Sequence, residues 1–284
     1  MERILLVVNK EKNIEYNALD EICRVLDENG MTYSCTDNME FQNMPYEDMA
    51  ALVAEFEMIM VLGGDGTLLG VAGVVQDIDI PLYGVNLGTV GFLTEGEMSS
   101  IAHQIHRLKS GDYDIEQRMM IRGTVIKPDA PDFSKGALND VVITRAGFSR
   151  LIGLKVYVNE KLLDTYEADG VVVSTPTGST GYNLSAGGPI VSPSASIIVI
   201  TPVSPHTLTS KSIVLAGDDK IRIEIVKTRK TLETEAIVSF DGGSSLPLSA
   251  GDIIEISRQQ EVTELVKLSK ISFYEIIREK LGGK

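Results

Sequence analysis

A carboxylate stands inside a run of glycines in the first quarter of the chain. Residues 58–70 read MIMVLGGDGTLLG, in which an apolar segment runs into the loop GGDGT at 63–67. Glycine-rich turns after buried strands bring backbone N–H groups close to phosphates. Asp65 would repel those phosphates, so it needs a metal ion or a hydroxyl group as its partner. Two roles are open for it: capping the helix that follows, or taking part in phosphate chemistry.

This loop differs from the common nucleotide-binding motifs. A Walker A loop requires a lysine that is absent here. Gly64, Gly66 and Gly70 give GxGxxxG, which misses the dinucleotide fingerprint GxGxxG by one residue. The loop also follows the third predicted strand and not the first. A hydride-transfer dinucleotide site is therefore disfavoured.

A second glycine-containing loop follows another apolar strand. Residues 169–189 read DGVVVSTPTGSTGYNLSAGGP and are dense in hydroxyl groups. The hydroxyl-bearing residues are Ser174, Thr175, Thr177, Ser179, Thr180 and Ser185. Free amides and hydroxyls suit a polar, phosphate-bearing ligand, whereas a single such stretch would also fit a polar turn with local caps. Two such loops, each beside an acid (Asp65 and Asp169), favour a shared nucleotide site.

A polar pair interrupts the start of a third predicted strand. Asn139 and Asp140 lie in ALNDVVITR, and together they provide a donor and an acceptor suited to the vicinal hydroxyls of a ribose. A plain turn signal would look the same. Spacing alone leaves both interpretations open.

The first hundred residues alternate between strand and helix patterns. Apolar strands are predicted at 3–9, 32–36, 58–62 and 81–88. Helices are predicted at 12–29, through Ile14, Leu19, Ile22 and Leu26 with Gly30 as the C-cap, and at 45–57, with Pro45 near the start. Near-continuous apolar strands separated by helices predict an open parallel sheet that is covered on both faces.

From about residue 118 the hydrophobic period changes to two. Residues 220–226 alternate cleanly, 154–166 predict a hairpin that turns at Asn159–Glu160, and 252–268 resemble another strand pair. This part is predicted to be a β-sandwich or a related all-β layer. Residues 272–282 return to helical spacing, with Phe273, Ile276, Ile277 and Leu281 on one face. The predicted domains are therefore an α/β domain at 1–98, a β-rich domain at 99–269 and a helix at 270–284 that returns to the first domain.

Composition excludes several classes of partner. The 284 residues include 40 acidic and 26 basic ones, which gives a net charge of -14. That sign disfavours nucleic acid and anionic membranes. No stretch approaches the roughly 18 apolar residues of a membrane span, and the first apolar run is too short for a signal peptide, so a cytoplasmic protein is expected. Cys23 and Cys35 are predicted to be small core residues, and the HxxH pair His103 and His106 a solvated helix face, so no metal-ligating residue is assigned.

Five motifs together resemble one family. They are GGDGT at 63–67, NLGTVGFLTE at 86–95, LND at 138–140, DGVVVSTPTGSTGYNLSAGGPIV at 169–191 and SFDGG at 239–243. In this order they resemble the ATP-NAD kinases, in their bacterial short form. GGDGT alone is shared with diacylglycerol, sphingosine and phosphofructo-type kinases, whereas the 169–191 motif is specific. The chain departs from the family pattern at Asp140, where Glu is common, at Gly181, where Ala is usual, and at Ala168, which replaces a frequent Gly.

The resemblance implies a reaction and a set of site residues. The reaction is transfer of the γ-phosphoryl group of ATP to the 2′-hydroxyl on the adenosine ribose of NAD, which gives NADP. Asp65 would be the base for that hydroxyl, with Mg²⁺ offsetting its repulsion of the phosphates. The glycine loop would admit the ATP phosphates through Gly63, Gly64, Gly66 and Thr67. Contacts to NAD are implied for Phe92, Asn139, Asp140, Asp169, Thr177, Thr180, Gly181, Tyr182 and Ser185.

The family also implies assembly and leaves rival functions open. Family members form dimers and tetramers with the 169–191 region near a subunit boundary, so a homodimer or homotetramer is expected. A diacylglycerol-type lipid kinase would share GGDGT and the two-domain plan, but it would have no use for the 169–191 loop. A non-catalytic NAD(P)-binding sensor would keep the pocket without turnover, and the intact Asp65 argues against it. Use of NADH or polyphosphate is left open.

Overall fold

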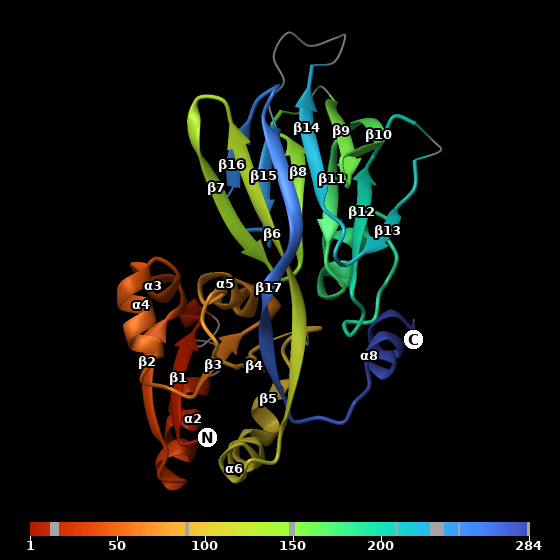
Figure 1. Ribbon diagram of the computed structural model, residues 1–284. Coiled ribbons are helices and arrows are strands. Elements are labelled where there is room, and N and C mark those ends of the chain that lie inside the picture. Colours follow the sequence, from red (N-terminus) through yellow and green to blue (C-terminus); the bar gives the residue numbers. More distant parts are fainter. Residues whose placement is uncertain are drawn as a thin grey trace. The chain divides into compact units, whose positions relative to one another are not determined.

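The computed structural model describes residues 1–11, 17–88, 91–147, 151–207, 210–227, 236–243 and 245–282. The chain forms two compact units, one made of Met1–Gln117 with Thr263–Lys284 and the other of Arg118–Val262 (Figure 1). The divisions fall inside two long strands, β6 (Asp114–Lys127) and β17 (Ile253–Lys267). The predicted domain boundary at residue 98 lies before helix α6 (Ile101–Ser110), which packs on helix α2 (Ala18–Glu28) in the first unit.

The first unit is built on a parallel sheet. Its strands are β1 (Arg3–Val8), β2 (Thr32–Asp37), β3 (Met58–Gly63) and β4 (Leu82–Asn86), in the order β2-β1-β3-β4. All three pairings are parallel. The short strand β5 (Gly96–Glu97) and the end of β17 both pair with β4. The predicted parallel sheet is therefore confirmed.

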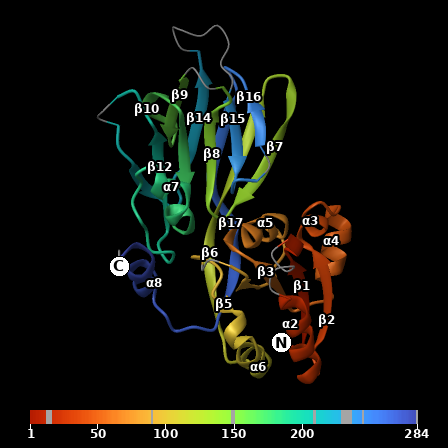
Figure 2. The same cartoon turned by 180° about the vertical axis from the view of Figure 1, so that it is seen from behind.

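Helices cover both faces of this sheet. Alternate residues of β1, including Ile4 and Leu6, share a buried cluster with α2 and α6. The opposite face packs against α5 (Asp65–Val74) and α3 (Asn38–Gln42), and α4 (Tyr46–Val53) lies beside α3, as Figures 1 and 2 show. Burial on two faces explains why β3 and β4 read as unbroken apolar runs, since neither side of these strands meets water.

Two details of the first unit differ from expectation. Cys35 is exposed and Cys23 is half-buried, because Cys35 lies on β2, the edge strand of the sheet. The short helix α3 was not predicted, and it begins where Asp37 accepts hydrogen bonds from the backbone N–H groups of Met39 and Glu40. Residues 12–16 of the predicted first helix, including Ile14, lie outside the described residues, and α2 begins at Ala18.

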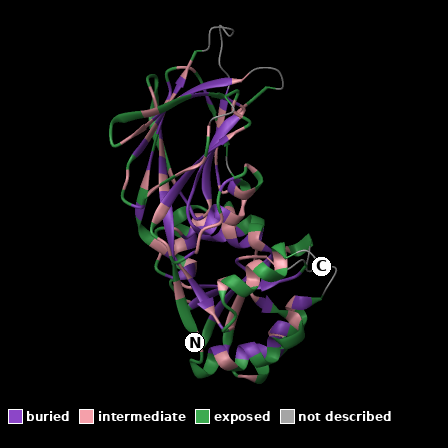
Figure 3. Cartoon of the chain, turned by 90° about the vertical axis from the view of Figure 1, so that its right-hand side faces the viewer, coloured by how far each residue is buried: buried purple, intermediate pink, exposed green. Residues whose placement is uncertain are grey.

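The second unit consists of antiparallel sheets. One has the order β13-β12-β11-β8-β15-β16. The other joins β10, β9, β14 and β17, with β6 paired to β17 and β7 paired to β6. The strands not yet given bounds are β7 (Ala130–Ala137), β8 (Asp140–Arg145), β9 (Ile152–Val158), β10 (Lys161–Ala168), β11 (Gly170–Ser174), β12 (Ile197–Val203), β13 (Ile213–Ala216), β14 (Ile221–Val226), β15 (Ala236–Phe240) and β16 (Ser245–Leu248). Inward residues of both sheets form one buried cluster, which the purple segments in Figure 3 follow. The predicted β-sandwich-like domain is confirmed.

The hairpin prediction was right and the second strand pair was wrong. β9 and β10 turn at Asn159 and Glu160, whose φ angles are 48° and 62°, as a two-residue hairpin turn requires. Residues 252–268 instead form the single long strand β17. The sequence between Arg258 and Val262 contains no Gly, Pro, Asn or Asp, so nothing there favours a turn.

The remaining elements are short, apart from the terminal helix. They are η1 (Met98–Ser100), η2 (Thr177–Thr180), α7 (Tyr182–Ser185) and α8 (Phe273–Leu281). Helix α8 confirms the predicted helical end, and it groups with the first unit. Among the described residues, no helix has the length and apolar character needed to cross a membrane.

Candidate active site

The glycine loop opens a cavity at the carboxyl ends of the parallel strands. In the order β2-β1-β3-β4 the second strand is added on one side of β1 and the third on the other, and open parallel sheets bind ligands at such switch points. The cavity has a volume of about 610 Å³. Its lining residues are Asn9, Asn38, Met39, Gln42, Gly64, Asp65, Gly66, Thr67 and Gly91.

Asp65 is the first residue of α5 and not its cap. The N-cap is Gly64, and no side-chain cap bond is formed. The capping interpretation of Asp65 is therefore wrong. A carboxylate in the first turn nevertheless meets the positive end of the helix dipole.

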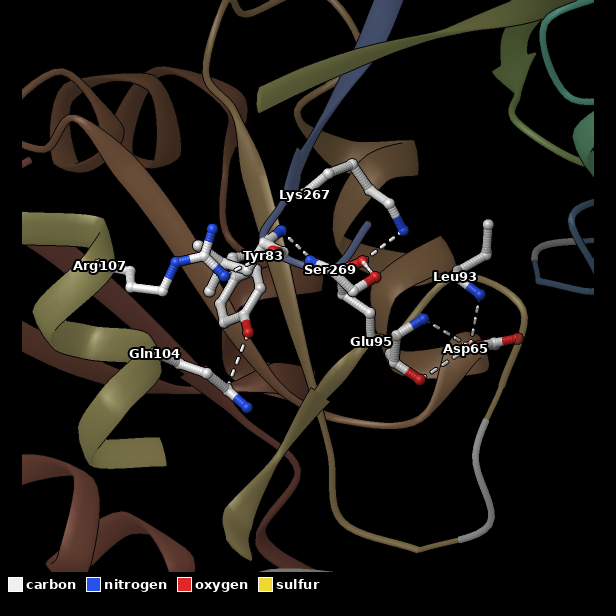
Figure 4. Close-up of polar contacts among 10 residues, drawn as sticks. Asp65, Tyr83, Leu93, Glu95, Gln104, Arg107, Lys267 and Ser269 are labelled. Carbon is white, nitrogen blue, oxygen red and sulfur yellow. Dashed lines mark hydrogen bonds and ion pairs between the residues drawn. The ribbon is translucent and has the colours of Figure 1, made fainter. Parts of the chain in front are cut away.

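The Asp65 carboxylate instead holds the loop that follows β4. Oδ2 accepts a hydrogen bond from Phe92 N at 2.6 Å. Oδ1 accepts three, from Leu93 N at 3.2 Å and from Thr94 N and Thr94 Oγ1 at 3.0 Å each; Figure 4 shows Asp65 with Leu93. The two oxygens of a carboxylate together offer about four lone-pair sites. Oδ2 thus has room for a further donor, whereas Oδ1 is saturated.

Glu95, the last residue of the loop 91–95, anchors the C-terminal end of that loop. Its carboxylate accepts hydrogen bonds from Ser269 N at 3.2 Å, from Ser269 Oγ at 3.0 Å and from Leu268 N. Lys267 Nζ lies 2.5 Å from Glu95 Oε2, and both side chains are less than one-fifth exposed (Figure 4). Thr89 and Val90 of the NLGTVGFLTE motif lie outside the described residues. The loop 91–95 is therefore held on one side by Asp65 and on the other by the start of the C-terminal segment.

The other predicted residues of the glycine loop differ in their surroundings. Thr67 is buried, and its Oγ1 accepts a hydrogen bond from Asn9 Nδ2 at 3.4 Å. A Cβ at Gly63 would overlap the Thr67 side chain, so this glycine serves local packing. Gly66 is exposed, with open space where a Cβ would lie. Its missing side chain leaves the backbone accessible from the cavity.

A second cavity lies in the second unit, where three strands end together. Asp140 at the start of β8 pairs with Ser174 at the end of β11, and Val141 pairs with Phe240 at the end of β15. The cavity has a volume of about 430 Å³. It is lined by Asn139, Asp140, Val142, Thr144, Tyr182, Ser239, Asp241 and Gly242.

Asp241 organises the Leu138–Asp140 turn, a role that sequence reasoning missed. Its carboxylate accepts hydrogen bonds from Leu138 N and Asn139 N at 2.7 Å each and from Asp140 N at 2.9 Å. Asp241 itself has a φ of 51°, a left-handed conformation. The available signal was the acid directly before two glycines in SFDGG, which repeats the pattern of an acid among glycines seen at 63–67.

Asn139 and Asp140 face the predicted 169–189 loop. A Cβ at Gly181 would lie 3.4 Å from Asn139 Nδ2 and 3.8 Å from Asp140 Oδ2. Asn139 Oδ1 is buried and has no hydrogen-bond partner among the described residues. A buried acceptor without a partner costs free energy, so a ligand donor would stabilise this site.

Burial raises the pKa of Asp140 to about 7, with the charge of Asp241 acting in the same direction. Burial also raises the pKa of Asp241, although the backbone N–H groups of residues 138–140 oppose this effect. The cavity therefore contains two closely spaced acids. A ligand that donates a hydrogen bond to the ionised Asp140 would be favoured there.

Most hydroxyls of the 169–189 loop bind the protein itself. Thr175 Oγ1 donates to Leu138 O, Thr180 Oγ1 donates to Thr177 O at 3.3 Å, and Thr177 Oγ1 accepts from Arg118 Nη1 at 3.3 Å. Tyr182 is 42% exposed and Ser185 is exposed. The polar-turn interpretation therefore accounts for several hydroxyls, while Tyr182 and Ser185 stay accessible.

Asp169 stands apart from this cavity. It precedes β11, whereas Asp140 pairs with the last residue of that strand. Its Oδ1 lies 2.6 Å from Arg145 Nε. The second unit thus brings Asn139, Asp140, Gly181 and Tyr182 together, and it leaves Asp169 at the other end of the sheet.

Comparison with known proteins matches both units. The family model for the ATP-NAD kinase N-terminal domain matches residues 4–113, and the model for the ATP-NAD kinase C-terminal domain matches residues 138–268. The chain belongs to the ATP-NAD kinase family. An NAD kinase from Lachnoclostridium phytofermentans is 43% identical over 286 residues, covering 100% of both chains. One from Agathobacter rectalis is 41% identical, covering 100% of this chain and 99% of its own.

Two solved structures share the fold. A yeast NADH kinase complexed with NADH has a TM-score of 0.79 at 24% identity, covering 99% of this chain and 88% of its own. An NAD kinase from Archaeoglobus fulgidus in complex with ATP has a TM-score of 0.76 at 24% identity, covering 99% of this chain and 97% of its own. The family resemblance drawn from the five motifs is confirmed.

Gly91→Ala is expected to displace the ATP-NAD kinase loop at 91–95. A Cβ at residue 91 would overlap the Asp65 carboxylate, so the loop must shift and break hydrogen bonds to Asp65. Each lost bond to a charged group costs about 1.5–3 kcal/mol. Thermal unfolding should show a clear fall in melting temperature. Gly66→Ala, where a Cβ meets open space, is the control, and equal melting temperatures for the two variants would contradict this expectation.

Asp140→Asn is expected to raise the melting temperature more at about pH 8 than at about pH 5. The folded-state pKa of about 7 exceeds the unfolded value of about 3.9. The unfolded state therefore loses its proton first, and the folded state loses stability as the pH rises through this window. Asparagine stays neutral, so the variant escapes this loss. Melting curves across the window measure it, with the exposed Asp132→Asn as control; a pH-independent difference would disprove the assignment.

Proposed function

We propose that this chain transfers the γ-phosphoryl group of ATP to the 2′-hydroxyl on the adenosine ribose of NAD, giving NADP. Curated relatives named NAD kinase, 41–43% identical over the whole chain, support this reaction. The structural observation that carries it is Asp65, whose Oδ2 has room for a donor at the mouth of a cavity lined by Gly64 and Gly66. Phosphoryl transfer needs positioning and charge compensation more than covalent chemistry. A fixed carboxylate beside accessible backbone suits that need.

Asp65 acts as the general base for the 2′-hydroxyl of NAD. Its Oδ2 takes the proton of the 2′-hydroxyl as the hydroxyl oxygen bonds to the γ-phosphorus. The bond from that phosphorus to the oxygen shared with the β-phosphate breaks, and ADP leaves with the electron pair. A positioned general base contributes roughly 10²–10⁴ in rate. The hydrogen bonds from residues 92–94 hold the carboxylate in place for this step.

The second cavity holds NAD. Asn139 Oδ1 accepts a donor from the dinucleotide, and Asp140 accepts a ribose hydroxyl proton in a hydrogen bond. Tyr182 lines the cavity and offers its exposed ring for stacking. Phe92, Thr177, Thr180, Gly181 and Ser185 complete the proposed NAD contacts. The buried, unpartnered oxygen of Asn139 supports this assignment.

The expected oligomer and the role of Asp169 are linked in this proposal, because the family resemblance puts the 169–191 region near a subunit boundary. We assign a homodimer or homotetramer on the family resemblance. Asp169, at the opposite end of β11 from Asp140, contributes an NAD contact near the subunit boundary in this proposal. Both substrates are intracellular metabolites, which supports a cytoplasmic location.

The residues of the first cavity fit a divalent magnesium ion. No cluster of three or more His, Cys, Asp or Glu occurs in the described part of the chain. Mg²⁺ usually keeps several waters and binds substrate phosphates, so the ATP phosphates and those waters would hold the ion, and Asp65 Oδ2 would stay free to act as the base. When bound, the ion neutralises charge on the transferred phosphoryl group.

One assay tests the reaction. Purified protein is mixed with Mg-ATP and NAD, and NADP is scored by a coupled NADP-specific dehydrogenase. NADP formation that EDTA abolishes is expected. Diacylglycerol serves as the competing acceptor: phosphorylation of the lipid instead of NAD would establish the lipid kinase. Binding of NAD without turnover would establish the sensor.

Asp65→Asn separates a catalytic role from a purely structural one. It should lower kcat roughly 10²–10⁴-fold with NAD binding retained. The amide also faces backbone donors in place of one oxygen, so a loss of stability is expected as well.

The matched control for Asp65→Asn is Thr94→Val. This variant removes the hydroxyl bond to Asp65 and keeps the carboxylate, so it should lose less than about tenfold in kcat. If Thr94→Val falls as far as Asp65→Asn, or if Asp65→Asn keeps more than about a third of the parent rate, Asp65 is a loop anchor and not the base.

A further inference from the structure

The terminal helix α8 places a lysine beside the loop that holds Asp65. Lys280 Nζ lies 4.5 Å from the centre of the Phe92 ring. The backbone N–H of Phe92 donates to Asp65 Oδ2 at 2.6 Å. The ammonium group and the proposed base therefore contact the same residue, and both belong to the first unit.

Helix α8 is fixed at its start. Ser272 and Glu275 form a capping box, in which each side chain accepts from the other residue's backbone N–H. The segment just before it is held by Glu95 through Leu268 and Ser269. The Glu95 contacts therefore join the loop 91–95 to residues 268–269, three residues before the capping box of α8. The position of Lys280 is thus tied to the loop that carries the Asp65 hydrogen bonds.

Lys280 lies on the packing face of α8. Phe273, Ile276 and Ile277 are half-buried, and so is Lys280, which follows them at helical spacing. Burial lowers the pKa of Lys280, whereas the charge of Asp65 acts in the opposite direction. A structural alternative exists, in which the alkyl stem covers the Phe92 ring and the charge serves no ligand. The experiment must separate these two roles.

The first cavity needs positive charge. Its described lining contains Asp65 and no lysine or arginine. Lys10, which follows the lining residue Asn9, lies within 3.8 Å of Asp37 and 3.5 Å of Glu40. Phosphoryl transfer places negative charge on the transferred group, and fixed cations stabilise it. A cation next to Phe92 is in the right place to do so.

We propose that Lys280 is a catalytic residue that binds the γ-phosphate of ATP during its transfer. The inference rests on the proposed kinase reaction for its role in turnover. It adds that the terminal helix belongs to the active site. It also predicts that the protein distinguishes ATP from ADP through this one side chain.

Nucleotide affinity tests the inference without requiring turnover. In the parent protein, calorimetry with Mg²⁺ should show tighter binding of ATP than of ADP. Lys280→Met keeps the length and apolar stem and removes the charge. It should lower ATP affinity by roughly tenfold or more, the size of a lost charge-assisted hydrogen bond, and leave ADP affinity within about twofold. Lys280→Arg should retain most of the preference.

Turnover and a matched control complete the test. Lys280→Met should lower kcat for NADP formation roughly ten- to a hundredfold. Arg278→Met on the same helix is the control, because residues two apart do not share a helix face and Arg278 is exposed. An unchanged ratio of ATP to ADP affinity in Lys280→Met, no such preference in the parent, or an equal loss in Arg278→Met would overturn the inference. If the parent forms no NADP but loses its ATP preference in Lys280→Met, the proposed reaction fails and the phosphate-binding role stands.

Discussion

The first cavity depends on one hydrogen-bonded carboxylate. Asp65 accepts three backbone N–H groups and one hydroxyl from residues 92–94, so the helix after β3 and the loop after β4 are held in one arrangement. Bonds of this kind to an ionised acceptor are among the stronger ones in proteins. Without this contact, the start of α5 would lose its hydrogen bonds to residues 92–94, and the loop would be held only through Glu95 and the pairing of β3 with β4. The same contact limits Asp65, because only Oδ2 has capacity left for a ligand.

The second unit contains the same arrangement, in which one carboxylate accepts several backbone N–H groups of a loop, with different residues. Asp241 accepts three backbone N–H groups from the turn at 138–140, just as Asp65 does from its loop. In each case an acid next to glycines fixes the backbone that presents other ligand-binding groups. The two acids differ in their neighbours, since both are half-buried but Asp241 lies close to a second acid, Asp140. Burial, and then the charge of Asp241, raise the pKa of Asp140 to about 7, so the second cavity retains a proton on Asp140 at pH values where an ordinary aspartate has lost it.

Much of the fold was predictable because its signals are local. The parallel sheet followed from unbroken apolar runs, and β14 followed from the alternation of Ile221, Ile223 and Ile225. The β9–β10 turn followed from Asn159. The prediction of a strand pair at 252–268 was wrong, because a long alternating stretch looks the same whether it forms a hairpin or one strand. The strands that pair with it determine which of the two forms. The boundaries between the two units could not be predicted from local sequence either, since they depend on which strands pair with each part of β6 and β17.

The site was predictable as a set of motifs and not as a set of contacts. GGDGT, Asn139 and Asp140 were found because acids and amides beside glycines are unusual. The hydrogen bonds from residues 92–94 to Asp65 span more than twenty-five positions along the chain, and no periodicity encodes them. Asp169 and Thr177 belong to one motif, but strand β11 separates them, and the motif gives no sign of that separation. Lys280 carried no motif at all, and only folding places it beside Phe92.

The route of the chain through β6 and β17 has a consequence for synthesis. The first unit is encoded in two pieces, and Leu265 of the second piece pairs with Leu82 of the first. On the ribosome, residues 118–262 emerge before that pairing partner exists. The second unit can therefore complete its antiparallel sheets while the parallel sheet still lacks its last strand, and the loop at 91–95 cannot meet Leu268 and Ser269 until translation is nearly over. The contacts of Glu95 with residues 268–269 are thus completed only when the last part of the polypeptide is available.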